Sequence, residues 1–214
     1  NYPFCTIDPN VGIVEVNDTR LTRLSEIDQP KKIIPAVIEF VDIAGLVAGA
    51  SEGEGLGNKF LANIRETDAI AHVIRCFEDD DITHVAGKID PISDIQTINT
   101  ELLLSDLAIV EKSLARLKKL AKTGNKEIMS ELKVMEEIEG ELNNGNFLQV
   151  IYKENKELLK QYNFLTAKPF FLILNVADDE INGNQFTQDV AKYCDENDIS
   201  HIIIYIQFYI QFYR

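Results

Sequence analysis

Short apolar runs separated by polar segments make up the two ends of the chain. Residues 11–16 (VGIVEV) and 36–41 (AVIEFV) have the β-branched composition of strands, and a short helix is predicted between them. Further strands are predicted at 70–77, 170–176 and 201–206, and helices at 55–69 and 184–198. Strands alternating with helices predict an α/β fold: a parallel sheet with helices on both faces and one hairpin at its start.

The middle of the chain follows a helical period instead. From Leu103 to Ala121 apolar residues recur at spacings of 4, 3, 4, 3 and 4, and the pattern resumes at Ile128 after the polar stretch KTGNK. This predicts an antiparallel hairpin of two long amphipathic helices. Such a hairpin can be a purely self-packing coiled coil, or its exposed faces can dock a partner. We expect an α/β domain in two parts, 1–93 and 161–206. A helical insertion, 94–160, separates the two parts, and a low-complexity tail follows at 207–214.

Charge and cysteine content narrow the class of protein. The formal net charge is −14, which argues against a uniformly basic nucleic-acid binder but leaves room for a local basic patch on the insertion. The three cysteines are far apart, which favours a reducing compartment and neither a disulfide framework nor a zinc site. The longest apolar stretch, near the carboxyl end, is only about a dozen residues, against about 20 for a membrane-spanning helix. We therefore expect a cytoplasmic protein with no membrane partner.

A glycine-rich segment, FVDIAGLVAGASEGEGLGNKF at 40–60, follows the second predicted strand. Asp42 ends that strand, which we expect to be buried, and a carboxylate at the carboxyl end of such a sheet can hold Mg²⁺. Gly45 lets a backbone N–H approach a γ-phosphate, and Thr6 in an upstream loop offers a second Mg²⁺ ligand. The alternative is a glycine-rich surface loop beside an ordinary capping aspartate.

Three stretches together resemble one family: NYPFCTIDPNVG at 1–12, the segment 40–70, and INTELLLSDL at 98–107. They are similar to the YchF/Obg-like ATPases, a branch of the Obg-related translation-factor GTPases, and Ala44 favours the YchF branch over Obg proper. The resemblance implies a Ras-like P-loop domain that hydrolyses ATP or GTP with Mg²⁺. It also implies association with the ribosome, and possible RNA contact through it.

The sequence also departs from the family pattern. The family's phosphate loop, G-x-x-x-x-G-K-[ST], would precede Asn1, and its carboxyl-terminal TGS domain is not in the sequence, so we expect a fragment. This predicts weak nucleotide binding by the chain alone. Three alternatives to an enzyme stay open. They are a ribosome-binding module that responds to nucleotide with negligible catalysis, a structural interaction protein that is built on the hairpin and is indifferent to nucleotide, and a nonfunctional truncated remnant.

The resemblance also implies the residues that contact the base and the attacking water. The base-recognition positions lie in LNVADDE (174–180) and are occupied by Asn175, Val176 and Asp178. The family has the pattern N-x-x-E at these positions, which goes with a preference for adenine. Asp178 is the acid that guanine recognition uses, so ATP is favoured and GTP stays possible. Leu46 stands where Ras-type enzymes orient water with glutamine. The resemblance proposes His84 for that role; the alternative is an ordinary surface histidine.

Overall fold

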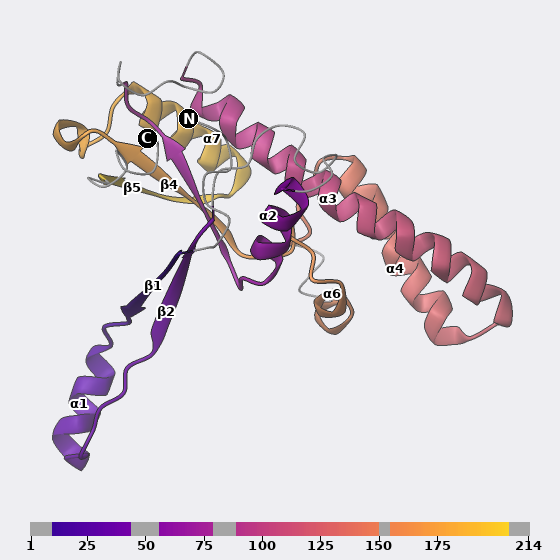
Figure 1. Ribbon diagram of the computed structural model, residues 1–214, viewed down its shortest axis with the longest axis horizontal. Helices are drawn as coiled ribbons and strands as arrows, with labels where there is room; N and C mark the ends of the chain where they lie inside the picture. The colour runs from indigo at the N-terminus through magenta and orange to yellow at the C-terminus, as the bar shows by residue number, and fades with distance from the viewer. Residues whose placement is uncertain (1–9, 44–55, 79–88, 150–154, 206–214) are drawn as a thin grey trace. The chain divides into compact units, whose positions relative to one another are not determined.

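The computed structural model describes residues 10–43, 56–78, 89–149 and 155–205 (Figure 1). The chain divides into two compact units, Tyr2–Gly45 and Leu46–Arg214. Thr6, Gly45, Leu46 and His84 lie outside the described residues, and so does the tail at 207–214.

The first unit contains an antiparallel hairpin and one helix. Strand β1 (Asn10–Glu15) pairs with β2 (Val37–Asp42), with Asn10 opposite Asp42, and helix α1 (Thr19–Asp28) lies between them in the sequence. Asp18 caps α1 by accepting a hydrogen bond of 2.9 Å from the Arg20 backbone N–H.

Two expectations for this hairpin are wrong. No described residue of the first unit is fully buried, so β2 is not the buried strand that its apolar composition predicted. The hairpin also forms a two-stranded sheet of its own, whereas we expected it to begin the parallel sheet. The physical reason is that two strands alone have no second layer to cover their apolar side chains, and within the described part of this unit no layer packs against them.

The second unit contains a parallel sheet in the order β3-β4-β5. Its strands are β3 (Ile70–Arg75), β4 (Phe170–Val176) and β5 (Ser200–Tyr205). The central strand is the most deeply buried, as its continuous apolar sequence requires. The predicted mixed α/β fold, with a parallel sheet flanked by helices, is therefore confirmed.

The sheet packs against helices to form the first of two cores. Helices α2 (Leu56–Arg65) and α7 (Gln185–Asn197) belong to this part of the chain, and the 3₁₀ turn η2 (Asp178–Glu180) follows β4. The core residues come from the strands, from α7 and from the start of α3 (Pro91–Leu120): Ile74, Cys76, Ile95, Leu172, Leu174, Val176, Val190 and Cys194.

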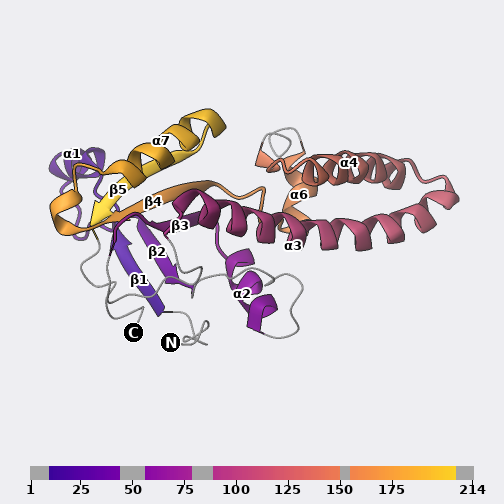
Figure 2. The same ribbon diagram turned by 90° about the horizontal axis from the view of Figure 1, so that it is seen from above.

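The predicted helical hairpin is also confirmed (Figure 2). Helix α3 runs for 30 residues, passes through the 3₁₀ turn η1 (Ala121–Thr123), and packs against α4 (Lys126–Asn143). Gly124 adopts φ +75° at the turn, and the Asn125 side chain caps α4. A second core joins α3 and α4 to α6 (Lys156–Tyr162), to the segment between α4 and α6, and to the segment before β4: Val110, Leu114, Leu117, Met135, Ile138, Leu142, Leu148, Leu159, Phe164 and Ala167. Among the described helices, none is long and apolar enough to cross a membrane.

Candidate nucleotide site at the carboxyl end of the sheet

The base-recognition residues predicted from the sequence lie at the carboxyl end of β4. Asn175 is buried and pairs in register with Arg75, the last residue of β3. The Cys76 N–H donates to the Asn175 carbonyl at 2.8 Å, so the backbone pairing continues past the end of β3. In open parallel sheets, ligands bind outside this edge. The strand end therefore places the Asn175 amide at the edge of the sheet where such ligands bind.

The loop that leaves β4 carries Asp178 in an exposed position. Val176 is buried beneath it, and Asp178 is the first residue of η2. The Asn184 amide donates to the Glu180 carboxylate at 2.8 Å and to the Cys76 carbonyl at 2.7 Å. These two bonds tie the turn after β4 to the end of β3. Asp178 is thus held on a braced turn three residues after Asn175.

Asn184 also begins helix α7. Its side chain accepts from the Thr187 N–H at 3.0 Å, and the Thr187 hydroxyl accepts from the Asn184 N–H at 2.8 Å. This reciprocal capping box fixes the direction in which the chain leaves the turn. The preceding Gly183 has φ +99°, and a Cβ there would lie 2.9 Å from the Thr187 hydroxyl oxygen. A glycine is required at this position for both reasons.

The Cys76 thiol beside this loop is not a reactive group. Burial raises the pKa of Cys76 to about 12, and the negative charges of Asp94 and Glu180 act in the same direction. The thiol is therefore protonated at neutral pH and is a poor nucleophile and a poor metal ligand. In the described ranges, no group of three or more His, Cys, Asp or Glu side chains is arranged to hold a metal ion.

The predicted Mg²⁺ and phosphate residues belong to other parts of the chain. Asp42 is exposed at the end of β2, in the first unit, with Asn10 as its register partner. Thr6, Gly45 and His84 are outside the described residues. The structure thus brings Asn175, Val176 and Asp178 together on one strand end and its following turn.

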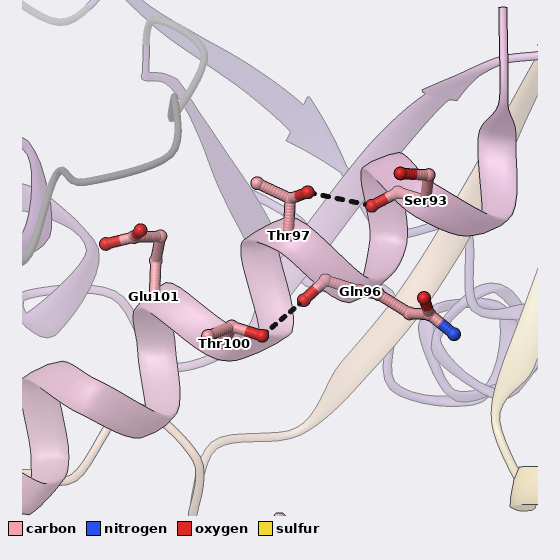
Figure 3. A pocket seen from close by; sticks show the side chains of 5 residues that line it. All are labelled: Ser93, Gln96, Thr97, Thr100 and Glu101. Atoms are coloured by element: carbon pink, nitrogen blue, oxygen red, sulfur yellow. Dashed lines mark hydrogen bonds between the residues drawn. The ribbon is translucent and has the colours of Figure 1, made fainter.

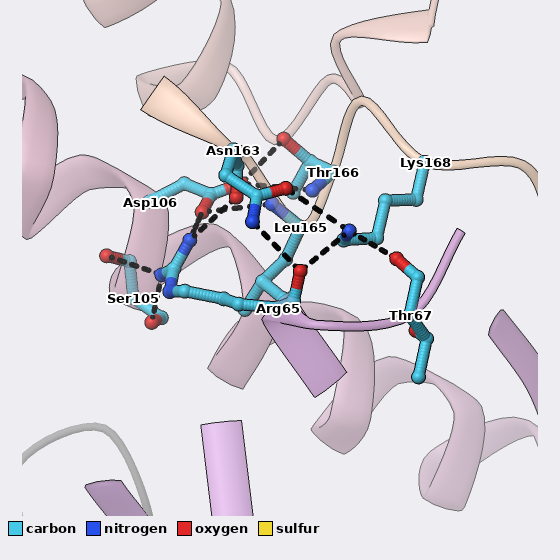
Figure 4. Close-up of polar contacts among 8 residues, drawn as sticks. All are labelled: Arg65, Thr67, Ser105, Asp106, Asn163, Leu165, Thr166 and Lys168. Atoms are coloured by element: carbon cyan, nitrogen blue, oxygen red, sulfur yellow. Dashed lines mark hydrogen bonds and ion pairs between the residues drawn. The ribbon is translucent and has the colours of Figure 1, made fainter. Parts of the chain in front are cut away.

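A buried carboxylate, which the sequence analysis missed, holds the end of helix α2 (Figure 4). Asp106 on α3 has no exposed side-chain area. Its Oδ1 accepts from Arg65 at 3.0 Å and from the Leu165 N–H at 3.1 Å; its Oδ2 accepts from the Thr166 N–H at 2.8 Å and hydroxyl at 2.9 Å. Burial raises the pKa of Asp106, while the Thr166 donors and the Arg65 guanidinium oppose that shift. All four contacts join residues at least 41 positions apart.

Lys168 and Asn163 complete this arrangement by capping the last carbonyls of α2. The Lys168 ammonium donates to the Arg65 carbonyl at 2.9 Å, to the Asn163 side-chain oxygen at 3.1 Å and to the Thr67 carbonyl. The Asn163 amide donates to the same Arg65 carbonyl at 2.7 Å. A cation at a helix carboxyl terminus is favourable because it meets the unsatisfied carbonyls. We call these four residues, Arg65, Asp106, Asn163 and Lys168, the α2 clamp.

A shallow hollow of about 280 Å³ lies along helix α3 (Figure 3). Its lining consists of Ser93, Gln96, Thr97, Thr100 and Glu101. The Thr97 hydroxyl donates to the Ser93 carbonyl at 2.9 Å, and Thr100 donates to the Gln96 carbonyl at 2.8 Å. Because these hydroxyl donors serve their own helix, the hollow offers few free donors to a ligand. The strand-end loop is the better candidate site.

Comparison with known proteins identifies the family. The family model described as 50S ribosome-binding GTPase matches residues 1–112. The chain belongs to this family of ribosome-binding GTPases. "Ribosome-binding ATPase YchF" of Haemophilus influenzae is 58% identical over 194 residues, covering 90% of this chain and 53% of that protein. The protein of the same name from Bacillus subtilis is 53% identical over 198 residues, with the same two coverages.

A solved structure agrees with the fold. The Schizosaccharomyces pombe YchF GTPase matches with a TM-score of 0.76 at 36% identity, covering 97% of this chain and 58% of that one. These matches confirm the resemblance to the YchF family that three short stretches of the sequence indicated. The chain spans about half the length of the curated relatives that it matches.

Proposed function

We propose that this chain forms part of a nucleoside triphosphatase of the YchF type, which binds and hydrolyses ATP and acts as a ribosome-associated switch. The proposal rests on the end of β4 and the turn after it, where Asn175 is buried in the strand and Asp178 is exposed on the turn that Asn184 braces. The family match supports it, because the chain belongs to a family of ribosome-binding GTPases. The helical insertion at 94–160 divides the nucleotide-binding domain into 1–93 and 161–206. The protein acts in the cytoplasm.

ATP is the proposed nucleotide, with GTP as the alternative. Val176 stands where the N-K-x-D pattern has a lysine, and its side chain is buried in the core of the sheet, so no lysine stem from this position covers the base. The names of the relatives support the same choice: the bacterial proteins at 58% and 53% identity are called ATPases, whereas the S. pombe protein at 36% is called a GTPase. Asp178 accepts hydrogen bonds from the base, and Asn175 contacts the base from the end of β4.

Hydrolysis is assigned to residues of the glycine-rich segment and its neighbours. The exposed carboxylate of Asp42 and the hydroxyl of Thr6 are suitable oxygen ligands for Mg²⁺, which neutralises developing phosphate charge when bound. Gly45 contacts the γ-phosphate through its backbone, and His84 holds the attacking water. Because Leu46 can neither donate nor accept a hydrogen bond, turnover is slow unless a partner contributes a further group.

The α2 clamp supports the idea of a switch. Helix α2 begins within the last residues of the glycine-rich segment, and its carboxyl end is bonded to α3, the first helix of the hairpin. A rearrangement of the glycine-rich segment therefore acts on a helix that is anchored to the hairpin. The ribosome is the proposed partner, because relatives over 50% identical are named as ribosome-binding.

The base assignment is tested by replacing one exposed acid and its neighbour. In a version of the protein that carries a phosphate loop ahead of Asn1, Asp178→Ala removes the proposed acceptor, and Asp179→Ala is the matched control on the same exposed turn. Hydrogen bonds to a charged group contribute about 1.5–3 kcal/mol, so ATP affinity should fall roughly 10- to 100-fold for the first variant only. Equal affinities of the two variants would show that Asp178 does not contact the base.

A further inference from the structure

The last residue of β3 is a buried arginine that the proposed nucleotide contacts do not use. Arg75 is 7% exposed and pairs in register with Asn175, at the strand end where the base is proposed to bind. Burying a guanidinium is costly unless its N–H groups find acceptors, so an arginine here must hold a defined set of partners. The chain bends at Phe77 as it leaves the sheet. We call residues 75–77 the β3 bend.

The Arg75 side chain folds back over the β3 bend. Its Nε donates a hydrogen bond of 3.1 Å to the Phe77 carbonyl, and its guanidinium carbon lies 4.9 Å from the centre of the Phe77 ring. One planar group therefore holds both the backbone and the side chain of the residue two positions ahead. A guanidinium can donate from Nε while its face lies on a ring, whereas a lysine has no donor at this point of its stem. The bend thus depends on arginine and not on positive charge alone.

Cys76, in the middle of the β3 bend, is bonded through both of its backbone polar groups to the candidate nucleotide site. Its N–H donates to the Asn175 carbonyl at 2.8 Å, and its carbonyl accepts from the Asn184 amide at 2.7 Å. Hydrogen bonds weaken steeply when donor and acceptor are misaligned. Both bonds therefore require the peptide orientation that the bend gives to Cys76.

Asn184 carries this orientation to the exposed acid of the site. The same amide donates to the Glu180 carboxylate at 2.8 Å. Glu180 is the last residue of the turn η2, and Asp178 is the first. The β3 bend and the turn that presents Asp178 are thus joined through one amide group.

We propose that Arg75 is a positioning residue for base selection. It acts through Cys76 and Asn184, and it holds Asp178 at the distance from Asn175 at which the two residues read one base. This role rests on the proposed function, in which these two residues contact the base. Because the phosphates are assigned to other segments of the chain, loss of the Arg75 contacts should impair the choice between bases more than it impairs phosphate binding.

A purely structural role for Arg75 leads to a different result. Replacing a buried arginine lowers stability whichever role holds. Lower stability reduces the fraction of protein that is competent to bind, which weakens the apparent affinities for ATP and GTP by the same factor. The ratio of the two affinities therefore reports the geometry of the site and is not changed by stability.

The test measures both affinities by calorimetric titration in the protein that carries a phosphate loop ahead of Asn1. Arg75→Lys keeps the charge and removes the Nε donor. Phe77→Leu keeps the arginine and removes its ring partner, at a half-buried position where folding is less at risk. Arg65→Lys is the matched control, because the Arg65 guanidinium is bonded to helix α3 instead.

The ratio of ATP affinity to GTP affinity should fall at least roughly threefold in Arg75→Lys and in Phe77→Leu, about the effect of one lost hydrogen bond or cation–π contact. It should stay unchanged in Arg65→Lys. Asn184→Ser keeps a capping hydroxyl for α7 and removes the amide that donates to Cys76. Because Arg75 and Asn184 act through the same carbonyl, the double variant should lose no more of the ratio than Asn184→Ser alone.

Retention of the ratio in both Arg75→Lys and Phe77→Leu would overturn the positioning role, and so would an equal fall in Arg65→Lys. Fully additive effects of Arg75→Lys and Asn184→Ser would also overturn it, because the two residues would then act independently.

The Asp178→Ala variant separates this role from the proposed function. If the unmodified protein prefers neither nucleotide, or if Asp178→Ala binds as well as Asp179→Ala, the base assignment fails and the positioning role fails with it. If Asp178→Ala alone loses affinity while the Arg75 and Phe77 variants keep the ratio, only the positioning role is refuted.

Discussion

Replacing Asp106 by Asn removes one charge from the centre of the α2 clamp and changes the side-chain volume very little. The carboxylate accepts four hydrogen bonds, two on each oxygen, from Arg65, Leu165 and Thr166. An asparagine has one carbonyl oxygen and one NH₂ group. In either orientation, the NH₂ group therefore faces two hydrogen-bond donors that previously met an oxygen.

The magnitude follows from burial. Breaking a buried ion pair from one side costs about 3–5 kcal/mol, and each unsatisfied buried donor costs about 1–3 kcal/mol. The terms overlap, and the Arg65 side chain keeps 19% exposure, so its guanidinium regains some hydration. We expect Asp106→Asn to lower the free energy of unfolding by about 3 kcal/mol.

Urea unfolding followed by far-UV circular dichroism measures this change. Glu111→Gln is the control, because Glu111 is exposed on the same helix, and it should alter stability by less than about 0.5 kcal/mol. Combining Asp106→Asn with Arg65→Gln gives a double-mutant cycle, with an expected coupling above about 1 kcal/mol. A stability of Asp106→Asn equal to that of the control would refute the structural role of the clamp.

Two further predictions concern stability. The His72 Nδ1 atom is buried with no hydrogen-bond partner in the described structure, and burial lowers the pKa of His72 from 6.5 to about 4. Below pH 6.5 the unfolded chain takes up a proton there that the folded chain does not, so this residue should reduce stability as pH falls toward 4, by up to about 3 kcal/mol. Urea unfolding across this pH range should show a smaller loss in His72→Leu, and an unchanged loss would contradict the assignment. Gly183→Ala should destabilise by at least about 1 kcal/mol, because φ is positive and the added Cβ meets Thr187, whereas Gly140→Ala in helix α4 meets open space and should stabilise by about 0.5–1 kcal/mol. Thermal melts that show the same sign for both glycines would contradict this reasoning.

Local patterns predicted the helices and strands well because their causes are local. The spacing from Leu103 to Ala121 defines an apolar stripe, and this stripe forms the packed face of α3 in the structure. The continuous apolar run of β4 likewise marks the central strand of the sheet. The capping box of Asn184 and Thr187 also has a local sequence signal, N-x-x-T before an amphipathic helix.

The errors and omissions concern contacts between distant parts of the chain. The composition of β2 is the same whether a second layer covers it or not, so its exposure was not predictable from residues 36–41. The α2 clamp joins Arg65 to Lys168, 103 positions apart, and no sequence spacing identifies such a pair. For the candidate site, the positions of Asn175 and Asp178 followed from the strand end, but the brace through Asn184 required the folded structure.

The most direct test of the central claim is calorimetric titration of MgATP and MgGTP into the protein that carries a phosphate loop ahead of Asn1. We expect ATP to bind roughly tenfold or more tightly than GTP, a difference of about 1.4 kcal/mol or more. The same preference should weaken in Asp178→Ala. Tighter binding of GTP would show that the loop after β4 selects guanine, and no binding of either nucleotide would rule out a nucleotide site there.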